Sequence, residues 1–344
     1  MSFAVHRLES ASRERWDAYV ARAEEATFFH RAGWKSVLER AFGHKTHFLF
    51  VAADDGEIAG ILPLVEVKSL LFGHSLSSTP FCVYGGIVAD TSEAAAALRQ
   101  AACDLAQSLK VDAMEFRNLQ DSGAGWPVKD LYFTFRKEID PDDEVNLKAI
   151  PNRQRAMIRK GIKEGLQGEW DEGVDRLYRV YSESVRNLGT PVFSKRYLQV
   201  LRDEFGEDCS VLMITHEGRD VAGVLNFYFR EEVLPYYGGS TAAARTIKGV
   251  SHFMYWELMR CSRERGCTLF DFGRSKAGTG PYSFKKNYGF EPQALAYEYY
   301  LVKADELPDV NPLNPKYQLM IKTWAKLPLP VANIVGPFIA KSLG

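Results

Sequence analysis

The sequence predicts an α/β protein with two tandem domains, each built on a central mixed sheet. A chain of 344 residues is long enough for two ordinary domains. Strand-like segments alternate with amphipathic helices, and the pattern of the first half returns in the second. The hydrophobic fraction of 46% and the charged fraction of 25% are those of a globular protein. We divide the chain into residues 1–140, residues 141–305 and a C-terminal extension, residues 306–344.

The internal repeat begins with two apolar strands around an acidic turn. HFLFVAADDGEIAGILPL in the first half corresponds to SVLMITHEGRDVAGVLNFYF in the second. We therefore expect Gly60 and Gly223 to occupy the same place in a β-β-α-β unit over residues 45–120 and 208–275. Each copy then reaches an aromatic-glycine sequence, which we interpret as a corner: Tyr84-Gly85-Gly86 and Tyr237-Gly238-Gly239.

A helix and a short acidic strand follow each corner. Apolar residues recur at helical spacing in TSEAAAALRQAACDLAQSLK and in GVSHFMYWELMRCSRERG, where Gly266 suits the helix end. The strands are AMEF, which contains Glu115, and LFDF, which contains Asp271. Asp90 precedes the first helix and allows two interpretations. It is either a general base or, with Glu93, a capping box, and we favour the capping box.

The joint between the two halves is followed by a basic segment. Pro141-Asp142-Asp143-Glu144 marks the joint, and residues 145–165 then hold six basic residues against Glu164 alone: Lys148, Arg153, Arg155, Arg159, Lys160 and Lys163. The segment predicts a helix that faces the groove between the domains. It attracts tRNA or a pyrophosphate-linked acceptor, or it is a solvated linker helix.

Residues 270–292, FDFGRSKAGTGPYSFKKNYGFEP, form the richest window for chemistry. A strand ends at Phe272-Gly273, a glycine-broken loop follows, and a helix should begin at Tyr282 and include Lys285. Loops that leave the strand ends of an α/β sheet are where ligands usually bind. Helical geometry places Lys286 about 100° around the helix from Lys285, so we expect Lys285 to point inward and Lys286 to face solvent.

The ending of this window resembles the Gly-Phe-Glu signature that closes the GNAT (N-acetyltransferase) domain. A lysine four residues before the glycine, directly after a phenylalanine, is similar to the Fem family of aminoacyl-tRNA-dependent peptidyltransferases, which have tandem GNAT-like domains. LKAIPNRQRAMIRKGIKEGL resembles the arginine-bearing helix that opens the second Fem domain, and FFHRAGWKSVLERAFG resembles the N-terminal helix of that family. ESVRNLGTPVFSKRYLQVL and the tail KLPLPVANIVGPFIAKSLG are most similar to FemAB-related proteins associated with exosortase and PEP-CTERM exopolysaccharide systems.

The resemblance implies a set of site residues in the second domain. Lys285 would stabilise the developing oxyanion, and Tyr282 would line the loop or relay a proton. The candidate substrate-binding residues are Arg274, Phe284, Tyr237, Arg186, Thr190, Lys195, Arg196 and Arg155. Surface charge is an equally good explanation for Arg186, Lys195 and Arg196.

The pyrophosphate loop of the GNAT fold has an altered counterpart here. The family pattern Arg/Gln-x-x-Gly-x-Gly/Ala corresponds to Thr246-Ile247-Lys248-Gly249-Val250-Ser251, in which Arg245 stands one place too early. Lys248, Gly249 and Ser251 are the candidate cofactor-binding residues, because a helix N-terminus binds phosphate through its unpaired N–H groups. The first domain has no such loop, and we expect it to be degenerate.

Several features bound the surroundings of the protein. Five cysteines without a CxxC pair indicate reduced thiols, and histidines without ligand spacing predict no metal site. The N-terminus lacks the apolar core of a signal peptide, so we expect a cytoplasmic protein. The tail allows at most peripheral contact with the inner membrane. Prolines at 328, 330 and 337 disfavour a long amphipathic helix there, so we favour packing of the tail against the body of the protein.

Three functions follow from these patterns. The preferred one is an acyltransferase or aminoacyltransferase that forms an amide on an amine acceptor, a small molecule or a lipid-linked envelope precursor. No cofactor is tightly bound, the acyl donor is aminoacyl-tRNA or acyl-CoA, and the net charge of −1 disfavours DNA as a partner. The second is an acetyl-CoA-dependent N-acetyltransferase acting on an amino sugar. The third is a non-catalytic binding protein of a polysaccharide assembly system.

Overall fold

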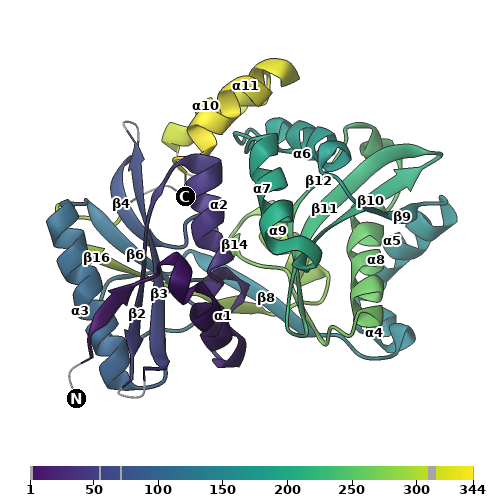
Figure 1. Cartoon of the computed structure of the whole chain (residues 1–344). Helices are drawn as coiled ribbons and strands as arrows, with labels where there is room; N and C mark the ends of the chain where they lie inside the picture. Colours follow the sequence, from purple (N-terminus) through teal and green to yellow (C-terminus); the bar gives the residue numbers. More distant parts are fainter. Residues whose placement is uncertain (1–2, 54–55, 70–71, 309–314, 344) are drawn as a thin grey trace. The chain divides into compact units, whose positions relative to one another are not determined.

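The computed structural model describes residues 3–53, 56–69, 72–308 and 315–343. The chain folds into two compact units (Figure 1). Unit 1 contains Met1–Tyr132, Ala294–Asp309 and Lys341–Gly344, and unit 2 contains Phe133–Gln293 and Val310–Ala340. Each unit has its own mixed sheet and its own helices, which confirms the predicted α/β class.

Unit 1 is one mixed sheet with helices packed against it. The strand order is β1-β2-β3-β4-β6-β16-β7 with β5 beside β3, and only the pair β4–β6 is parallel among the described pairings. The strands are β1 (Val5–Arg7), β2 (Lys45–Ala52), β3 (Ile58–Ser69), β4 (Gly73–Ser78), β5 (Val88–Ala89), β6 (Ala113–Asn118), β7 (Val128–Lys129) and β16 (Ala296–Leu301). The helices are α1 (Arg13–Arg22), α2 (Gly33–Phe42) and α3 (Ser92–Leu109), with short turns η1 (Ser10–Ser12) and η2 (Phe28–His30).

Unit 2 has a corresponding sheet of order β14-β8-β13-β12-β11-β10-β9, with β15 beside β8. The pair β12–β13 is parallel, as β4–β6 is in unit 1. The strands are β8 (Tyr132–Glu138), β9 (Gln167–Asp171), β10 (Cys209–His216), β11 (Arg219–Phe229), β12 (Glu232–Ser240), β13 (Leu269–Asp271), β14 (Ser275–Lys276) and β15 (Pro292–Ala294). The helices are α4 (Asp143–Ala149), α5 (Asn152–Lys163), α6 (Asp175–Asn187), α7 (Lys195–Phe205), α8 (Val250–Glu264), α9 (Gly280–Asn287), α10 (Pro315–Trp324) and α11 (Leu329–Ala340), with turns η3 (Gly206–Asp208) and η4 (Ala243–Thr246).

The predicted repeat has matching elements in the two units. β2, β3, α3 and β6 follow one another in unit 1 as β10, β11, α8 and β13 do in unit 2. The first copy contains two further strands, β4 and β5, and the second contains one, β12. Gly60 and Gly223 lie on the second strand of their copies, opposite Val51 and Met213, and each is near an irregularity in the strand register. Superposition of the two copies stays a prediction.

Each sheet is completed by a strand from the other half of the sequence. β16, which follows the elements of unit 2 along the chain, pairs antiparallel with β6 in the sheet of unit 1. β8, which follows those of unit 1, pairs antiparallel with β13 in the sheet of unit 2. The two units are therefore interleaved in sequence, whereas the boundaries at residues 140 and 305 assume consecutive domains.

Two local predictions are wrong. Tyr237-Gly238-Gly239 lies inside β12 rather than at a corner, because a Cβ on Gly239 would come within 2.4 Å of Ser184 Cβ and the close packing of α6 requires glycine there. The cap of α3 is Thr91, which accepts a hydrogen bond from the Ala94 N–H at 3.2 Å. Asp90 instead accepts one from the Tyr19 hydroxyl at 2.9 Å. In the tail, Pro330 and Pro337 lie in the short helix α11, which packs against α6.

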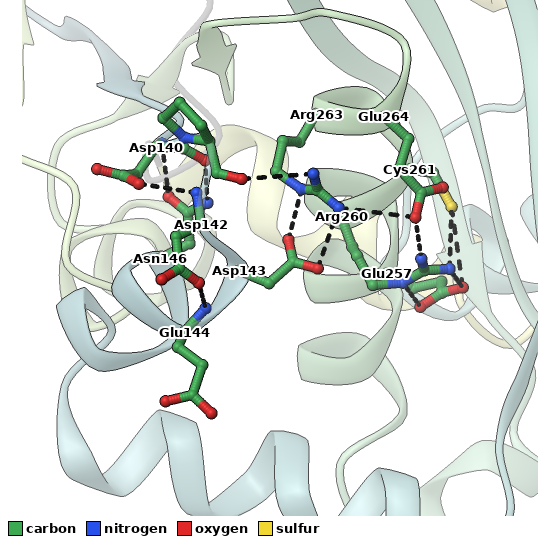
Figure 2. A network of polar contacts seen from close by, with 11 residues as sticks. Asp140, Asp142, Asp143, Glu144, Asn146, Glu257, Arg260, Cys261, Arg263 and Glu264 are labelled. Carbon is green, nitrogen blue, oxygen red and sulfur yellow. Dashed lines mark hydrogen bonds and ion pairs between the residues drawn. The ribbon is translucent and has the colours of Figure 1, made fainter.

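The basic segment forms two helices rather than one, and an ion pair fixes the first of them. The helix breaks at Ile150-Pro151, because a residue before proline disfavours the α conformation. Asp142 caps α4 by accepting the Glu144 N–H at 2.8 Å. Asp143 receives the Arg263 Nε–H of α8 at 2.8 Å, which ties α4 to α8 (Figure 2). This arrangement carries α5 along the side of α8.

Candidate functional site

Lys285 occupies the centre of the predicted window, as the helical period predicts. Its Nζ donates to three consecutive carbonyl oxygens, those of Phe272 at 2.6 Å, Gly273 at 3.0 Å and Arg274 at 3.1 Å. Lys286, the next residue of α9, is exposed. The ammonium of Lys285 therefore holds the loop that leaves β13, and all three of its N–H donors are used there.

The surroundings of Lys285 are apolar. Its Nζ lies 5.5 Å from the ring centre of Phe135 and 5.9 Å from that of Phe272. Burial lowers the pKa of Lys285 to about 7, the positive charge of Arg274 adds to this effect, and the negative charge of Asp271 opposes it. Lys285 therefore loses its proton closer to neutral pH than an exposed lysine does. A neutral amine has two N–H donors, so deprotonation releases one of the three carbonyl oxygens.

Buried acidic side chains also stabilise the loop that leaves β13. Asp271 is fully buried and accepts the Gly273 N–H at 2.6 Å. Because Lys285 donates to the Gly273 carbonyl oxygen, both backbone polar groups of Gly273 are hydrogen-bonded. Arg136 bridges Asp271 at 3.3 Å and Glu232 at 3.1 Å. Burial and the nearby Asp271 raise the pKa of Glu232 to about 8, against the opposing effect of Arg136. Burial and Asp271 thus disfavour the charged form of Glu232, which limits the negative charge of this cluster.

The N-terminus of α8 is close to this loop through aromatic packing. Tyr288, which follows α9, donates its hydroxyl to the His252 carbonyl in the first turn of α8 at 3.0 Å. The Phe284 ring lies 5.2 Å from the His252 ring and 5.7 Å from the Tyr255 ring. Gly249 is the N-cap of α8, and no side chain of the described residues caps the helix. A helix N-terminus without a side-chain cap is the kind of feature that binds phosphate through its first N–H groups.

Helix α5 lies directly against the N-cap of α8. Gly249 has φ of +83°, and a Cβ there would come within 2.2 Å of the Met157 carbonyl oxygen. Gly161 is equally close to α8, because a Cβ on it would come within 2.9 Å of Phe253 Cβ. The two glycines let the helices approach closely, so that α5, which carries the basic residues, lies beside the first turn of α8.

The charge of α5 is uncompensated on its solvent side. Four of its basic residues are exposed and have no acidic partner in the described part of the chain: Arg153, Arg159, Lys160 and Lys163. Arg155 differs, because it donates to the Lys148 carbonyl at 3.2 Å and to Asn152 and so closes the first turn of its own helix. The structure therefore gives Arg155 local contacts.

The other predicted residues have varied surroundings. Tyr282 packs edge-on against Phe133 and Phe135, so it lines the Lys285 loop. Lys248 is exposed beside Gly249, and Ser251 is half-buried. Tyr237 is buried and shares a hydrogen bond of 2.8 Å with the Tyr197 hydroxyl. The remaining candidates lie on α6, on α7 or between them. Arg186 donates to the Leu327 carbonyl, and Lys195 pairs with Asp175 at 2.9 Å. Thr190 and Arg196 are exposed.

Sequence reasoning missed the residues that support the loop, Arg136, Glu232 and Asp271. Asp271 had a signal, because an acid between phenylalanines in a strand is a buried acid that requires partners. Arg136 and Glu232 had none, because they reach Asp271 only through the pairing of β8, β12 and β13.

No group of three or more His, Cys, Asp or Glu side chains in residues 3–53, 56–69, 72–308 and 315–343 is placed to hold a metal ion. Within the same ranges, no helix combines the length and the hydrophobicity that crossing a bilayer requires.

Comparisons with known proteins agree with this geometry. Residues 152–286 match the family model described as an acetyltransferase (GNAT) domain. That range contains α5, the N-terminus of α8, the loop after β13 and Lys285. The sequence matches none of the curated proteins.

Solved structures extend the likeness to most of the chain. FemX is similar with a TM-score of 0.67 at 16% identity over 92% of this chain and 100% of FemX. A tandem GNAT protein from the clavulanic acid biosynthesis pathway has a TM-score of 0.58 at 12% identity over 89% of this chain and 100% of its own. L-PGS from Bacillus licheniformis has a TM-score of 0.51 at 15% identity over 86% and 96%. The family match over residues 152–286 and the fold shared along most of the chain confirm the predicted fold class of two tandem GNAT-like units.

Proposed function

We propose that unit 2 binds a phosphate-bearing acyl donor across α5 and the first turn of α8, and transfers its acyl group to an amine. One observation carries this proposal: exposed, uncompensated cations on α5 adjoin the uncapped N-terminus of α8. Both features attract phosphate. The Lys285 loop, joined to α8 by Phe284 and Tyr288, is then the place of reaction.

Aminoacyl-tRNA is the donor that this surface favours. Four exposed cations along one helix suit a polyanion, and the likeness to FemX makes a Fem-like aminoacyl transfer the leading candidate. The family match gives acetyl-CoA as the second candidate. Lys248-Gly249-Val250-Ser251 at the start of α8 would receive its pyrophosphate. The acceptor would be an amine on an envelope or exopolysaccharide precursor, in line with the resemblance to exosortase-associated proteins. In this proposal unit 1 is a partner that does not itself bind the acyl donor.

Lys285 has two possible parts in this reaction. As an ammonium beside the reacting carbonyl it would stabilise the oxyanion, but this requires it to release one loop carbonyl. As the bond donor to residues 272–274 it would instead be a positioning residue that shapes the loop. Tyr282 and Arg274 border the same loop and are the candidates for proton relay and for binding a phosphate or carboxylate.

Salt dependence tests the donor surface. Replacing Arg153, Arg159 and Lys160 with alanine should weaken binding of tRNA and reduce the slope of log affinity against log salt by about 2–3, because each lost phosphate contact removes about 0.7–0.9. The measurement is fluorescence anisotropy of labelled tRNA from 50 to 300 mM salt, with coenzyme A as competitor.

The control is a triple alanine variant of Arg179, Arg219 and Arg230, three exposed arginines of unit 2 outside α5. It changes the net charge equally, so a general charge effect would reduce its slope as much. An equal reduction in both triple variants would contradict a specific donor surface on α5.

We also propose that the tail contacts an anionic membrane surface. Ala332, Gly336 and Ala340 face inward on α11, and a Cβ on Gly336 would come within 2.9 Å of the Val192 nitrogen. The outward side carries apolar residues at i, i+3, i+4 and i+7: Val331, Ile334, Val335 and Phe338, of which Ile334 and Phe338 are 68% and 69% exposed.

The charge of the tail selects an anionic partner. Residues 310–344 contain four lysines and no acid. An apolar helix face flanked by lysines suits anionic lipid, whereas two such tails would repel one another. The protein would thus be cytoplasmic and peripheral to the inner membrane.

Vesicle flotation tests this contact. The protein should float with vesicles that contain phosphatidylglycerol and much less with pure phosphatidylcholine, and Ile334→Glu/Phe338→Glu should abolish flotation. Val145→Glu, which charges an exposed apolar residue of α4, should not change it. The proposal would be contradicted if the Ile334→Glu/Phe338→Glu variant floated as well as the Val145→Glu variant. Equal flotation with the two kinds of vesicle would also contradict it.

A further inference from the structure

Unit 1 contains a cavity that none of the functions above uses. Its volume is about 290 Å³, the space of about ten water molecules. The turn η2, residues 84–88 and the end of β6 line this cavity. Figure 1 labels β6. All three belong to unit 1, so the cavity is complete within that unit.

A buried histidine presents a hydrogen-bond donor to this cavity. His30 is 2% exposed, and its Nδ1 accepts the Thr27 N–H at 3.1 Å. Burial lowers the pKa of His30 to about 4, against smaller opposing effects of the Gly86 and Thr27 backbone. The ring is therefore neutral and carries its proton on Nε2. Nε2 is buried and makes no hydrogen bond of normal geometry among the described residues, although the Gly86 backbone is near enough to affect the pKa of the ring.

Asn118 supplies a second donor at the end of β6. Its Nδ2 is buried and likewise has no partner in the described part of the chain. A Cβ on Gly86, whose φ is +99°, would come within 2.0 Å of the Asn118 Oδ1. Only glycine at position 86 leaves room for this amide. Two buried donors without partners cost free energy that a ligand oxygen would recover.

The remaining lining sets the charge and shape of the ligand. Glu25 and Asp121 line the cavity, and no Lys or Arg does so. This charge repels phosphate and attracts an amine. The buried rings of Tyr84 and Phe116 form an apolar wall for one face of the ligand.

We propose that this cavity binds a monosaccharide-sized polar amine without phosphate, of the amino-sugar class. Its hydroxyl or carbonyl oxygens accept from His30 Nε2 and Asn118 Nδ2, and its ammonium faces Glu25 and Asp121. The use of this amine as the acceptor of the acyl group rests on the proposed function, whereas its binding does not.

Ligand-observed NMR titrations of the full chain test the site with three probes: glucosamine, glucose and glucosamine 6-phosphate. Glucosamine should bind more tightly than glucose by about fivefold, since it adds two partly exposed charge contacts. Glucosamine 6-phosphate should bind more weakly than glucosamine. Binding is measured without any acyl donor, so failure here is distinct from failure of acyl transfer.

Two variants separate the contacts. Glu25→Gln/Asp121→Asn should remove the preference for glucosamine and leave glucose binding unchanged. Asn118→Ala should weaken both sugars, with thermal unfolding measured to establish that it is folded. Should folding fail, the first variant still decides, because both of its residues are exposed. No saturable binding of glucosamine, equal binding of all three probes, or an unchanged preference in the double variant would overturn the proposal.

Discussion

Replacing Lys285 with methionine should lower turnover by about 10²–10³-fold, the loss seen when one oxyanion donor is removed. Methionine fills similar space but leaves the carbonyls of residues 272–274 without their shared donor. Lys286→Met is the matched control, because Lys286 is the neighbouring exposed lysine of α9. Steady-state transfer rates check the expectation. A larger loss in Lys286→Met, or full activity in both variants, would show that Lys285 has no catalytic or positioning part.

The pH profile separates the two parts of Lys285. The pKa of about 7 means that the charged form disappears as pH rises through 7. If the ammonium stabilises the oxyanion, kcat should fall above pH 7, and Lys285→Arg should keep its activity to higher pH because arginine stays charged. If Lys285 only positions the loop, KM and kcat should change together in the methionine variant.

The second large effect concerns stability. Gly249→Ala should lower the free energy of unfolding by about 2–4 kcal/mol, because alanine is strained at positive φ and its Cβ would meet the Met157 carbonyl oxygen. Donor binding should weaken as well, since α5 must move away from α8. Urea unfolding followed by circular dichroism measures the change.

Gly165→Ala is the matched control for this substitution. Gly165 follows α5 with φ of +80°, but a Cβ there meets no atom within 4 Å. It should show only the cost of the backbone conformation, about 1 kcal/mol. Equal losses at the two positions would contradict the close packing of α5 on the N-cap of α8.

Much of unit 2 was predictable because its signals are local. The 3.6-residue period marked α8 and α9, and the four-residue spacing of Lys285 from Gly289 predicted its inward direction. The break at Pro151 was also readable from local rules, since proline disfavours a helical residue before it. These features depend on the sequence within one or two turns.

The remaining features depend on partners far apart in sequence. β8 joins the sheet of unit 2 and β16 joins the sheet of unit 1. The two sheets are similar, and alternating hydrophobicity does not determine which of them a strand joins. His30 looked like part of an aromatic helix motif, and its role as a donor appears only because Asn118 and Gly86 meet it across unit 1. Asp90 likewise has a partner distant in sequence, because it accepts the Tyr19 hydroxyl instead of capping a helix.

Hydrogen–deuterium exchange with bound donor tests the central claim most directly. Aminoacyl-tRNA or coenzyme A added to the full chain should slow exchange in α5 and at residues 250–252, where the uncapped N–H groups of α8 lie. The α6–α7 segment, with Arg186, Lys195 and Arg196, should exchange as before. Protection on α6 and α7 without protection of α5 and α8, or no protection by either donor, would contradict a donor site at the N-terminus of α8.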